Sequence, residues 1–192
     1  MFNLIKEYYR KKRLMAQSLK ESGRFTNLKG VESVSFAYAI HSEADMESVL
    51  EIYNFLKWKS VKISAIIVES KKDVFQKIAN IEELQSNVDF TFIGYNNLDW
   101  LGDIKEGSAT DFFANRSNLF INFNSASNFA LSRIAQRVVA DMVIGMHNDA
   151  DIPYTFIVAD KDGGLLQPIE YLNQIFHYLK IINKDLGRDS NE

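Results

Sequence analysis

The segment NLFINFNSASNFALSRIAQRVVADMVIG, residues 118–145, decides the fold of this chain of 192 residues. Its first part, 118–123, places apolar side chains on both faces of an extended segment, as in a strand that is covered on both sides. A helix is expected over 126–140, and the short, partly β-branched run 142–146 is expected to form the next strand. A strand, a helix and a second strand in so short a segment predict a right-handed crossover unit of a parallel sheet.

The same alternation is expected along the rest of the chain. Ser42 followed by Asp45 has the spacing of a helix cap, and Pro168 suits the first turn of the last helix. The prediction is an α/β fold: a single Rossmann-like three-layer sandwich with a mostly parallel sheet and an extra basic N-terminal helix. Strands are predicted at 31–40, 61–68, 90–95 and 154–159, and helices at 3–22, 42–58, 73–80, 111–114 and 168–183.

Three regions follow from this pattern. Residues 1–30 are predicted to be a basic helical arm with a linker, 31–184 the Rossmann-like domain, and 185–192 a polar tail. Residues 1–30 hold eight of the 22 basic side chains and two of the 25 acidic ones, a net charge of +6, which leaves −9 for the other residues. A basic arm on an acidic body is the charge feature most directly tied to function.

The composition is that of a globular protein, with 46% hydrophobic and 12% aromatic residues. No apolar run reaches roughly eighteen residues, so no transmembrane helix is expected. Charges at Lys6, Glu7 and 10–13 interrupt the N-terminal apolar stretch, so no signal peptide is expected and a cytoplasmic location is predicted. The chain has no cysteine, which excludes disulfides, thiolate catalysis and cysteine-based metal sites.

The basic arm has three interpretations. In the first, the arm binds RNA phosphates and its tyrosines stack on bases. In the second, it lies on an anionic membrane surface. In the third, it is a solvated helix that folds onto the acidic body. A membrane helix needs a cleaner apolar face, so RNA or a ribosomal particle is favoured over a membrane. The residues expected to contact nucleic acid or a partner are Tyr8, Tyr9, Arg10, Lys11, Lys12 and Arg13.

A polar elbow between the central strand and its helix is the predicted ligand-binding site. Ligands gather at the carboxyl ends of strands in open α/β sheets, and a helix N-terminus favours anions. The commoner interpretation is that these side chains only cap the helix. The elbow residues are Asn122, Asn124, Ser125, Ser127 and Asn128.

The first strand-to-helix loop, 41–45, argues against a dinucleotide site. It contains no glycine that would let backbone amides approach a pyrophosphate, and Glu43 and Asp45 would repel phosphate. No complete catalytic motif is present, and no G-x-S-x-G elbow marks a nucleophile. The only acid–base candidates are His41 and Asp45, so the sequence favours a protein that is not an enzyme and leaves a small enzyme as the alternative.

Two loops carry fragments of metal-binding patterns. His147 with Asp149 and Asp151 offers ligands for a hard metal, but such residues are more often solvated. The segment 160–163 begins like a calcium loop and lacks the closing glutamate, so a turn is predicted. No metal and no cofactor is therefore predicted.

The segment INFNSASNFALSRIAQRVVADMVIG, 121–145, resembles a unit in the N-terminal half of heptosyltransferase-type glycosyltransferases. Ile144 and Gly145 match that unit, Asn122 replaces its aspartate, and Ser125 lies near its glycine. The nearest counterpart of the family's catalytic aspartate is Asp45. Such enzymes hold the sugar nucleotide with a second Rossmann-like domain, for which this chain has no length. The resemblance therefore implies a shared half-fold and not shared catalysis.

The whole chain also resembles an uncharacterised bacterial family, a domain of unknown function, of short Rossmann-like proteins. The resemblance rests on the lysine-rich N-terminal helix, the central strand and helix unit, and a C-terminal helix with the sequence LNQIFHYLKIIN, 172–183. It implies this architecture and a bacterial cytoplasmic setting, and it names no substrate.

Two functional hypotheses result. The first is a non-catalytic cytoplasmic binding or adaptor protein whose basic arm associates with RNA or ribosomal particles. The alternative is a small enzyme or sensor that binds an anionic metabolite or sugar nucleotide at the elbow, 122–128.

Overall fold

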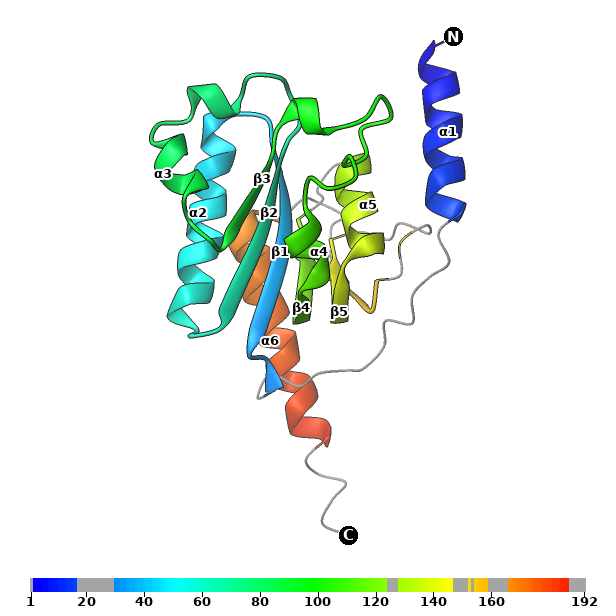
Figure 1. Cartoon of the computed structure of the whole chain (residues 1–192). Coiled ribbons are helices and arrows are strands. Elements are labelled where there is room, and N and C mark those ends of the chain that lie inside the picture. The colour runs from blue at the N-terminus through cyan, green and yellow to red at the C-terminus, as the bar shows by residue number, and fades with distance from the viewer. Residues whose placement is uncertain are drawn as a thin grey trace.

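The computed structural model describes residues 2–16, 30–123, 128–146, 152, 154–158 and 166–186. Six strands form one parallel sheet in the order β3-β2-β1-β4-β5-β6 (Figure 1). The order reverses between β1 and β4, as in doubly wound Rossmann folds. The predicted α/β class and parallel sheet are confirmed. The strands are β1 (Ser33–Ile40), β2 (Lys62–Glu69), β3 (Phe90–Ile93), β4 (Arg116–Asn122), β5 (Val139–Gly145) and β6 (Phe156–Ile157).

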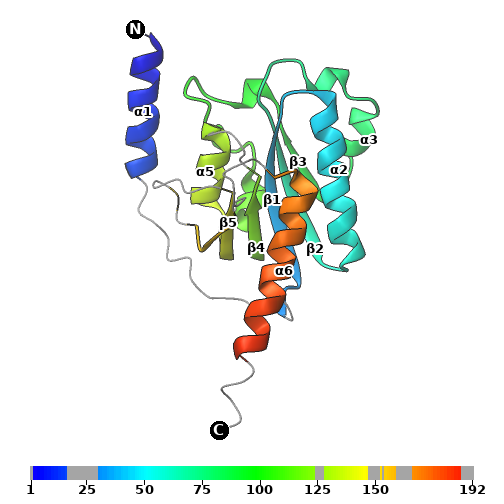
Figure 2. The same cartoon turned by 180° about the vertical axis from the view of Figure 1, so that it is seen from behind.

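Helices cover both faces of the sheet. The helices α2 (Glu43–Trp58) and α6 (Pro168–Leu186) pack on one face, which Figure 2 shows from the front. The helices α4 (Thr110–Ala114) and α5 (Phe129–Arg137) pack on the other face. In β4, Leu119 and Ile121 lie in the first core while Phe120 lies in the second. This alternation confirms that the central strand is buried on both sides.

Several local predictions differ from the structure; the strand predicted at 154–159, for example, is only Phe156–Ile157 in the part of that range that the structure describes. The helix predicted at 73–80 is wrong, because Asp73 and Asn80 have positive φ angles of 65° and 58°, which a right-handed helix does not admit. The 3₁₀ turn η2 (Phe75–Lys77) and the short helix α3 (Ile81–Gln85) stand there instead. The helix predicted at 126–140 is shorter, because Val138 is already extended.

The capping prediction at the start of α2 is confirmed. Asp45 accepts hydrogen bonds from the backbone amide and the hydroxyl of Ser42. Ser42, the N-cap, and Asp45, three residues later, thus form a capping box at the start of α2. The last helix is slightly longer than predicted, since α6 continues to Leu186 and the prediction ended at 183.

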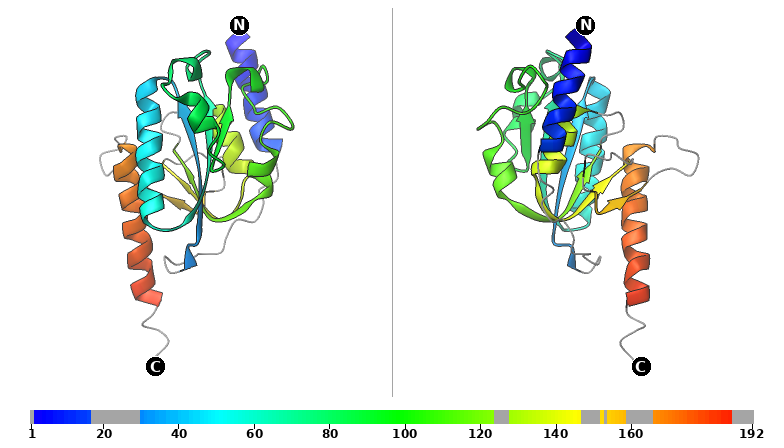
Figure 3. Two further views of the ribbon diagram at one scale, coloured as in Figure 1. Left: turned by 60° about the vertical axis from the view of Figure 1, so that its left-hand side comes forward. Right: turned by 90° about the vertical axis from the view of Figure 1, so that its right-hand side faces the viewer.

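The N-terminal helix α1 (Phe2–Ala16) lies against α5 at the side of the molecule, where Figure 3 shows it from two directions. Neither core contains a described side chain of α1. The arm is therefore docked on the body without being part of its apolar interior. No helix in the described ranges is long and apolar enough to cross a membrane.

Candidate functional site

Four polar side chains lie close together beyond the carboxyl ends of the strands β1, β2, β3 and β4. His41 directly follows β1, Ser70 follows β2, and Tyr95 opens the 3₁₀ turn η3 (Tyr95–Asn97) after β3. Asn128 is the N-cap of α5, after β4. Its Nδ2 donates to the Oγ of Ser70 at 3.0 Å, so the two loops beside β1 meet across it. This is the point at which the strand order reverses, the usual ligand position in open α/β sheets.

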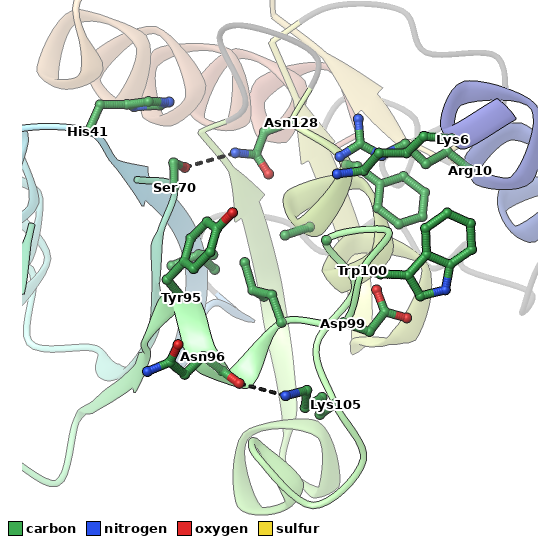
Figure 4. A pocket seen from close by; sticks show the side chains of 15 residues that line it. Lys6, Arg10, His41, Ser70, Tyr95, Asn96, Asp99, Trp100, Lys105 and Asn128 are labelled. Atoms are coloured by element: carbon green, nitrogen blue, oxygen red, sulfur yellow. Dashed lines mark hydrogen bonds between the residues drawn. The ribbon is translucent and has the colours of Figure 1, made fainter. Parts of the chain in front are cut away.

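A cavity of about 620 Å³ opens at this edge, and we call it the crevice (Figure 4). Its volume lies within the range of about 300–1,000 Å³ for small-molecule sites. The four strand-end residues form one side of it. The remaining walls come from the loop after β3, through Trp100 and Lys105, and from α1, through Lys6 and Arg10.

The loop 98–105 has a tight turn that brings it to α1. Asp99 Oδ1 accepts hydrogen bonds from the amides of Leu101 at 2.8 Å and Asp103 at 2.9 Å. Gly102 has a φ of 91°, and a Cβ at this position would lie 3.3 Å from a guanidinium nitrogen of Arg10. The same guanidinium donates through Nε to the carbonyl of Leu101 at 2.7 Å. Glycine thus allows both the turn and the close approach of the arm.

Buried Asp103 is the centre of a charged cluster behind the crevice. Its carboxylate lies 2.9 Å from Arg133 Nε, 3.4 Å from Arg13 Nη1 and 3.8 Å from Arg137 Nη1. Arg13 also contacts Asp99 at 2.5 Å. These ion pairs join three elements, since Arg13 belongs to α1, the carboxylates to the loop, and the other two arginines to α5.

Arg13 of the arm helps to lower the pKa of Asp99 in the loop 98–105. Burial alone would raise the pKa of Asp99, but hydrogen bonds from Arg13 and from the amides of Asp103 and Leu101 outweigh it, and the pKa lies below its ordinary value of 3.8. The hydrogen bond to Asp99 in turn raises the pKa of Arg13. Both groups therefore stay charged at neutral pH, and the contact between α1 and the loop is an ion pair.

The crevice has an excess of positive charge. Lys6, Arg10 and Lys105 line it, whereas the only carboxylate among its described lining residues is Asp99, which Arg13 already pairs. Arg10 also lies 5.1 Å from the centre of the Phe129 ring. The side chains of Tyr95 and Trp100, both about half exposed, add aromatic surface. Cations beside aromatic rings suit an anion that carries a planar or apolar part.

The first strand-to-helix loop does not offer its amides to a ligand. The backbone amides of His41 and Ser42 donate to Asp45 Oδ2 at 2.8 and 2.9 Å. Asp45 is thus occupied as the cap of α2, and its Oδ2 lies 3.9 Å from Nδ1 of His41. Of the two predicted acid–base candidates, only His41 lines the crevice. A phosphate bound here would be held by side-chain cations and not by a glycine-rich turn.

The structure separates the predicted elbow residues. Asn124, Ser125 and Ser127 lie outside the described residues. Asn122 is fully buried, and its Nδ2 donates to the hydroxyl of Tyr154 at 2.8 Å, so it does not reach the crevice. Asn128 lines the crevice and also caps α5, because its Oδ1 accepts from the Leu131 amide at 3.2 Å. Capping and ligand contact are therefore compatible at this position.

The predicted arm residues point in two directions. Arg10 and Arg13 face the body, and Tyr9 meets Trp100 edge to face with ring centres 5.8 Å apart. On the opposite side of α1, Lys11 and Lys12 are exposed and 64% of the Tyr8 surface is accessible.

Sequence reasoning missed most of the crevice. The residues that it did not single out are Lys6, Ser70, Tyr95, Trp100 and Lys105. A usable signal existed for Ser70 and Tyr95, because Ser70 comes shortly after the strand predicted at 61–68 and Tyr95 is the last residue of the strand predicted at 90–95. No three His, Cys, Asp or Glu side chains in the described ranges are grouped to hold a metal, and the pattern of His147, Asp149 and Asp151, which the sequence does not predict to be a metal site, lies outside those ranges.

Comparison with known protein families identifies the chain. A family model described as a family of unknown function, DUF6913, matches residues 5–182. The chain belongs to this family. The match spans most of α1, the whole sheet and most of α6, so the arm residues that line the crevice are part of the DUF6913 unit. Neither the curated proteins nor the solved structures contain a match to the chain.

Proposed function

We propose that this DUF6913 chain is a binding protein whose crevice holds an anionic small molecule. The observation that carries the proposal is the cavity of about 620 Å³ at the point of strand-order reversal, lined by three basic side chains from α1 and the loop 98–105. Ser70 and Asn128 supply hydrogen-bonding groups at its floor, and Trp100 and Tyr95 supply aromatic walls.

The chemistry of the lining narrows the ligand class. Because Asp45 occupies the amides of the first loop, the anionic group is expected near Lys6, Arg10 and Lys105 instead. A phosphate or carboxylate there leaves the aromatic walls to a ring or an apolar part of the ligand. The resemblance of 121–145 to heptosyltransferase-type enzymes makes a sugar nucleotide one member of this class.

The direct test is a thermal-shift and calorimetric titration with inorganic phosphate, pyrophosphate, AMP and UDP-glucose. A probe at about 100 times its dissociation constant stabilises the native state by about 2.7 kcal/mol. For a domain of this size that corresponds to a rise in Tm of roughly 5–10 °C. The variant Lys6→Ala/Lys105→Ala is expected to bind at least about tenfold more weakly, because each charged hydrogen bond contributes about 1.5–3 kcal/mol.

The matched control is Lys11→Ala/Lys12→Ala, which removes the same charge from the exposed side of the arm. It is expected to bind like the wild type. If no probe binds at millimolar concentration, or if the crevice variant and the control bind equally, the proposal is wrong.

A second candidate function is an adaptor that binds RNA or a ribosomal particle through the outward side of α1. It is favoured by the exposure of Lys11, Lys12 and Tyr8, whereas Arg10 and Arg13 are engaged with the body. Sedimentation of a gentle lysate at low and high salt, with and without ribonuclease, tests it. Co-migration that the double alanine variant of Lys11 and Lys12 loses supports the adaptor, since each lost phosphate contact lowers the salt dependence. Free migration under every condition contradicts it.

A further inference from the structure

The arm supplies part of the crevice although it lies outside both cores. Lys6 and Arg10 are the residues through which α1 lines the cavity, and the rest of the wall belongs to the body. Without α1 the crevice loses two of its three basic side chains. Ligand binding and the position of the arm therefore depend on each other in this geometry.

Several contacts that dock α1 are polar, beside the edge-to-face contact of Tyr9 with Trp100. Arg10 donates to the Leu101 carbonyl, Arg13 pairs with Asp99, and the carbonyl of Leu14 accepts from Gln136 Nε2 at 3.0 Å. The side chain of Arg13 is 38% exposed, so solvent screens its ion pair. Partly exposed pairs of this kind contribute at most about 1 kcal/mol each, which makes docking of the arm a weak equilibrium.

The docked state also leaves basic groups that the body does not neutralise. Arg13 pairs with Asp99 and Asp103, and the two arginines of α5 pair with Asp103. Among the described residues, the carboxylate that pairs with Arg10 is Glu7 of its own helix, and none on the body forms an ion pair with Lys6 or Arg10. An anion in the crevice would supply a negative charge for Lys6 and a second one, beside that of Glu7, for Arg10.

We propose that α1 is a ligand-coupled arm: an anion in the crevice and the docking of α1 on the loop 98–105 stabilise each other. The inference rests on the proposed function, and it adds that an arm residue outside the crevice controls affinity. Coupling of this kind is reciprocal, because the ligand favours the docked arm by the same factor by which docking favours the ligand. When only a fraction of molecules is docked, the apparent dissociation constant rises as the inverse of that fraction.

Arg13 is the residue with which to test this coupling, because it docks the arm and does not line the crevice. Arg13→Ala is expected to weaken the binding of AMP and pyrophosphate by about fivefold. Arg13→Glu, which places a carboxylate against Asp99 and Asp103, is expected to weaken it by about tenfold or more. Lys12→Glu is the matched control, because it makes the same charge change on the exposed side of the same helix.

A native fluorophore reports docking in the same samples. The chain has two tryptophans, and Trp58→Phe leaves Trp100, which touches Tyr9 of the arm. Trp58 is 74% exposed on α2 and lies outside the crevice, so its replacement is expected to be neutral. In this background Arg13→Glu should shift Trp100 emission to the red without any probe, and AMP should shift the emission of the parent to the blue.

The outcomes separate the two proposals. If none of inorganic phosphate, pyrophosphate, AMP and UDP-glucose binds the parent, the proposed function and the coupling both fail. If the parent binds and the two Arg13 variants bind within twofold of it, the coupling alone is overturned. A cooperative thermal transition in each variant shows that it is folded, and Arg13→Ala keeps the test valid if the glutamate variant does not fold.

Discussion

Replacing Asp103 with asparagine should destabilise the folded domain as well as release the arm. Its carboxylate contacts Arg13, Arg133 and Arg137, and its Oδ1 also accepts from the amide of Ile104 at 2.9 Å. Asparagine keeps the size of the side chain and can still accept from that amide. It removes the negative charge on which three guanidinium groups converge.

The magnitude follows from how much of each ion pair is exposed. In the pair between Asp103 and Arg133 the side chains are only 9% and 11% exposed, so this charged hydrogen bond contributes about 1.5–3 kcal/mol. The pairs to Arg13 and Arg137 are longer and more exposed, and they add at most a few tenths to about 1 kcal/mol. We expect the free energy of unfolding to fall by about 2–3 kcal/mol, which lowers Tm by roughly 4–12 °C.

Urea denaturation followed by circular dichroism at pH 7 measures this loss. The control is Glu51→Gln, an exposed acid on α2, whose effect should stay within about 0.5 kcal/mol. If Asp103→Asn changes the free energy of unfolding no more than the control does, the cluster does not hold the loop against α5, and the reasoning is refuted.

Three further predictions concern the same framework. Gly102→Ala, at a φ of 91° and against a guanidinium of the arm, should cost about 1 kcal/mol and shift Trp100 emission as Arg13→Glu does. Gly145→Ala should lower the free energy of unfolding by about 1–3 kcal/mol in urea melts, because its Cβ would lie 2.5 Å from the Tyr154 ring. The Asp99 carboxylate should favour docking of the arm at every pH above its ordinary pKa of 3.8, and this effect should be lost as the pH falls through its lower pKa in the folded protein. In Arg13→Ala, a carboxyl NMR titration should show that the pKa of Asp99 is raised relative to the wild type.

Each of these has a clear contrary result. An alanine at Gly102 that leaves Trp100 emission native would mean that the turn does not set the approach of the arm. An unchanged urea midpoint for Gly145→Ala would mean that the Tyr154 ring moves aside freely. An Asp99 pKa that is the same with and without Arg13 would show that the arm is undocked in solution.

Much of the architecture could be predicted because it depends on local sequence patterns, such as apolar alternation in strands and capping residues at helix starts. The alternation of Leu119, Phe120 and Ile121 between the two cores marks a strand covered on both sides, and Ser42 with Asp45 marks the start of α2. The strand order could not be predicted, since backbone hydrogen bonds between strands leave no residue-specific trace. The helix expected at 73–80 failed because the left-handed conformations of Asp73 and Asn80 are turn features that apolar periodicity does not reveal.

The candidate site was less predictable for a different reason. Asn128 could be found because it belongs to the run of polar residues between the central strand and the helix that follows it, where it caps α5. Lys6 and Trp100 are far apart in the sequence and line the same cavity only because the arm packs against the loop after β3, where Tyr9 contacts Trp100. Arg10 and Arg13 belong to a charged run that is typical of a solvated face. The groups that they contact on the body lie about ninety residues away: the Leu101 carbonyl for Arg10, and the carboxylates of Asp99 and Asp103 for Arg13.

The most direct test of the binding proposal is an amide-resolved NMR titration of the isotope-labelled protein with AMP. The account predicts saturable shifts at His41, Ser70, Tyr95 and Asn128 and at the indole of Trp100, with further shifts along α1 as the arm is stabilised. Saturable shifts confined to another surface, such as the groove between α2 and α6 beside Phe55 and Phe176, would contradict it. So would a spectrum that does not change at millimolar AMP while pyrophosphate and UDP-glucose also leave it unchanged.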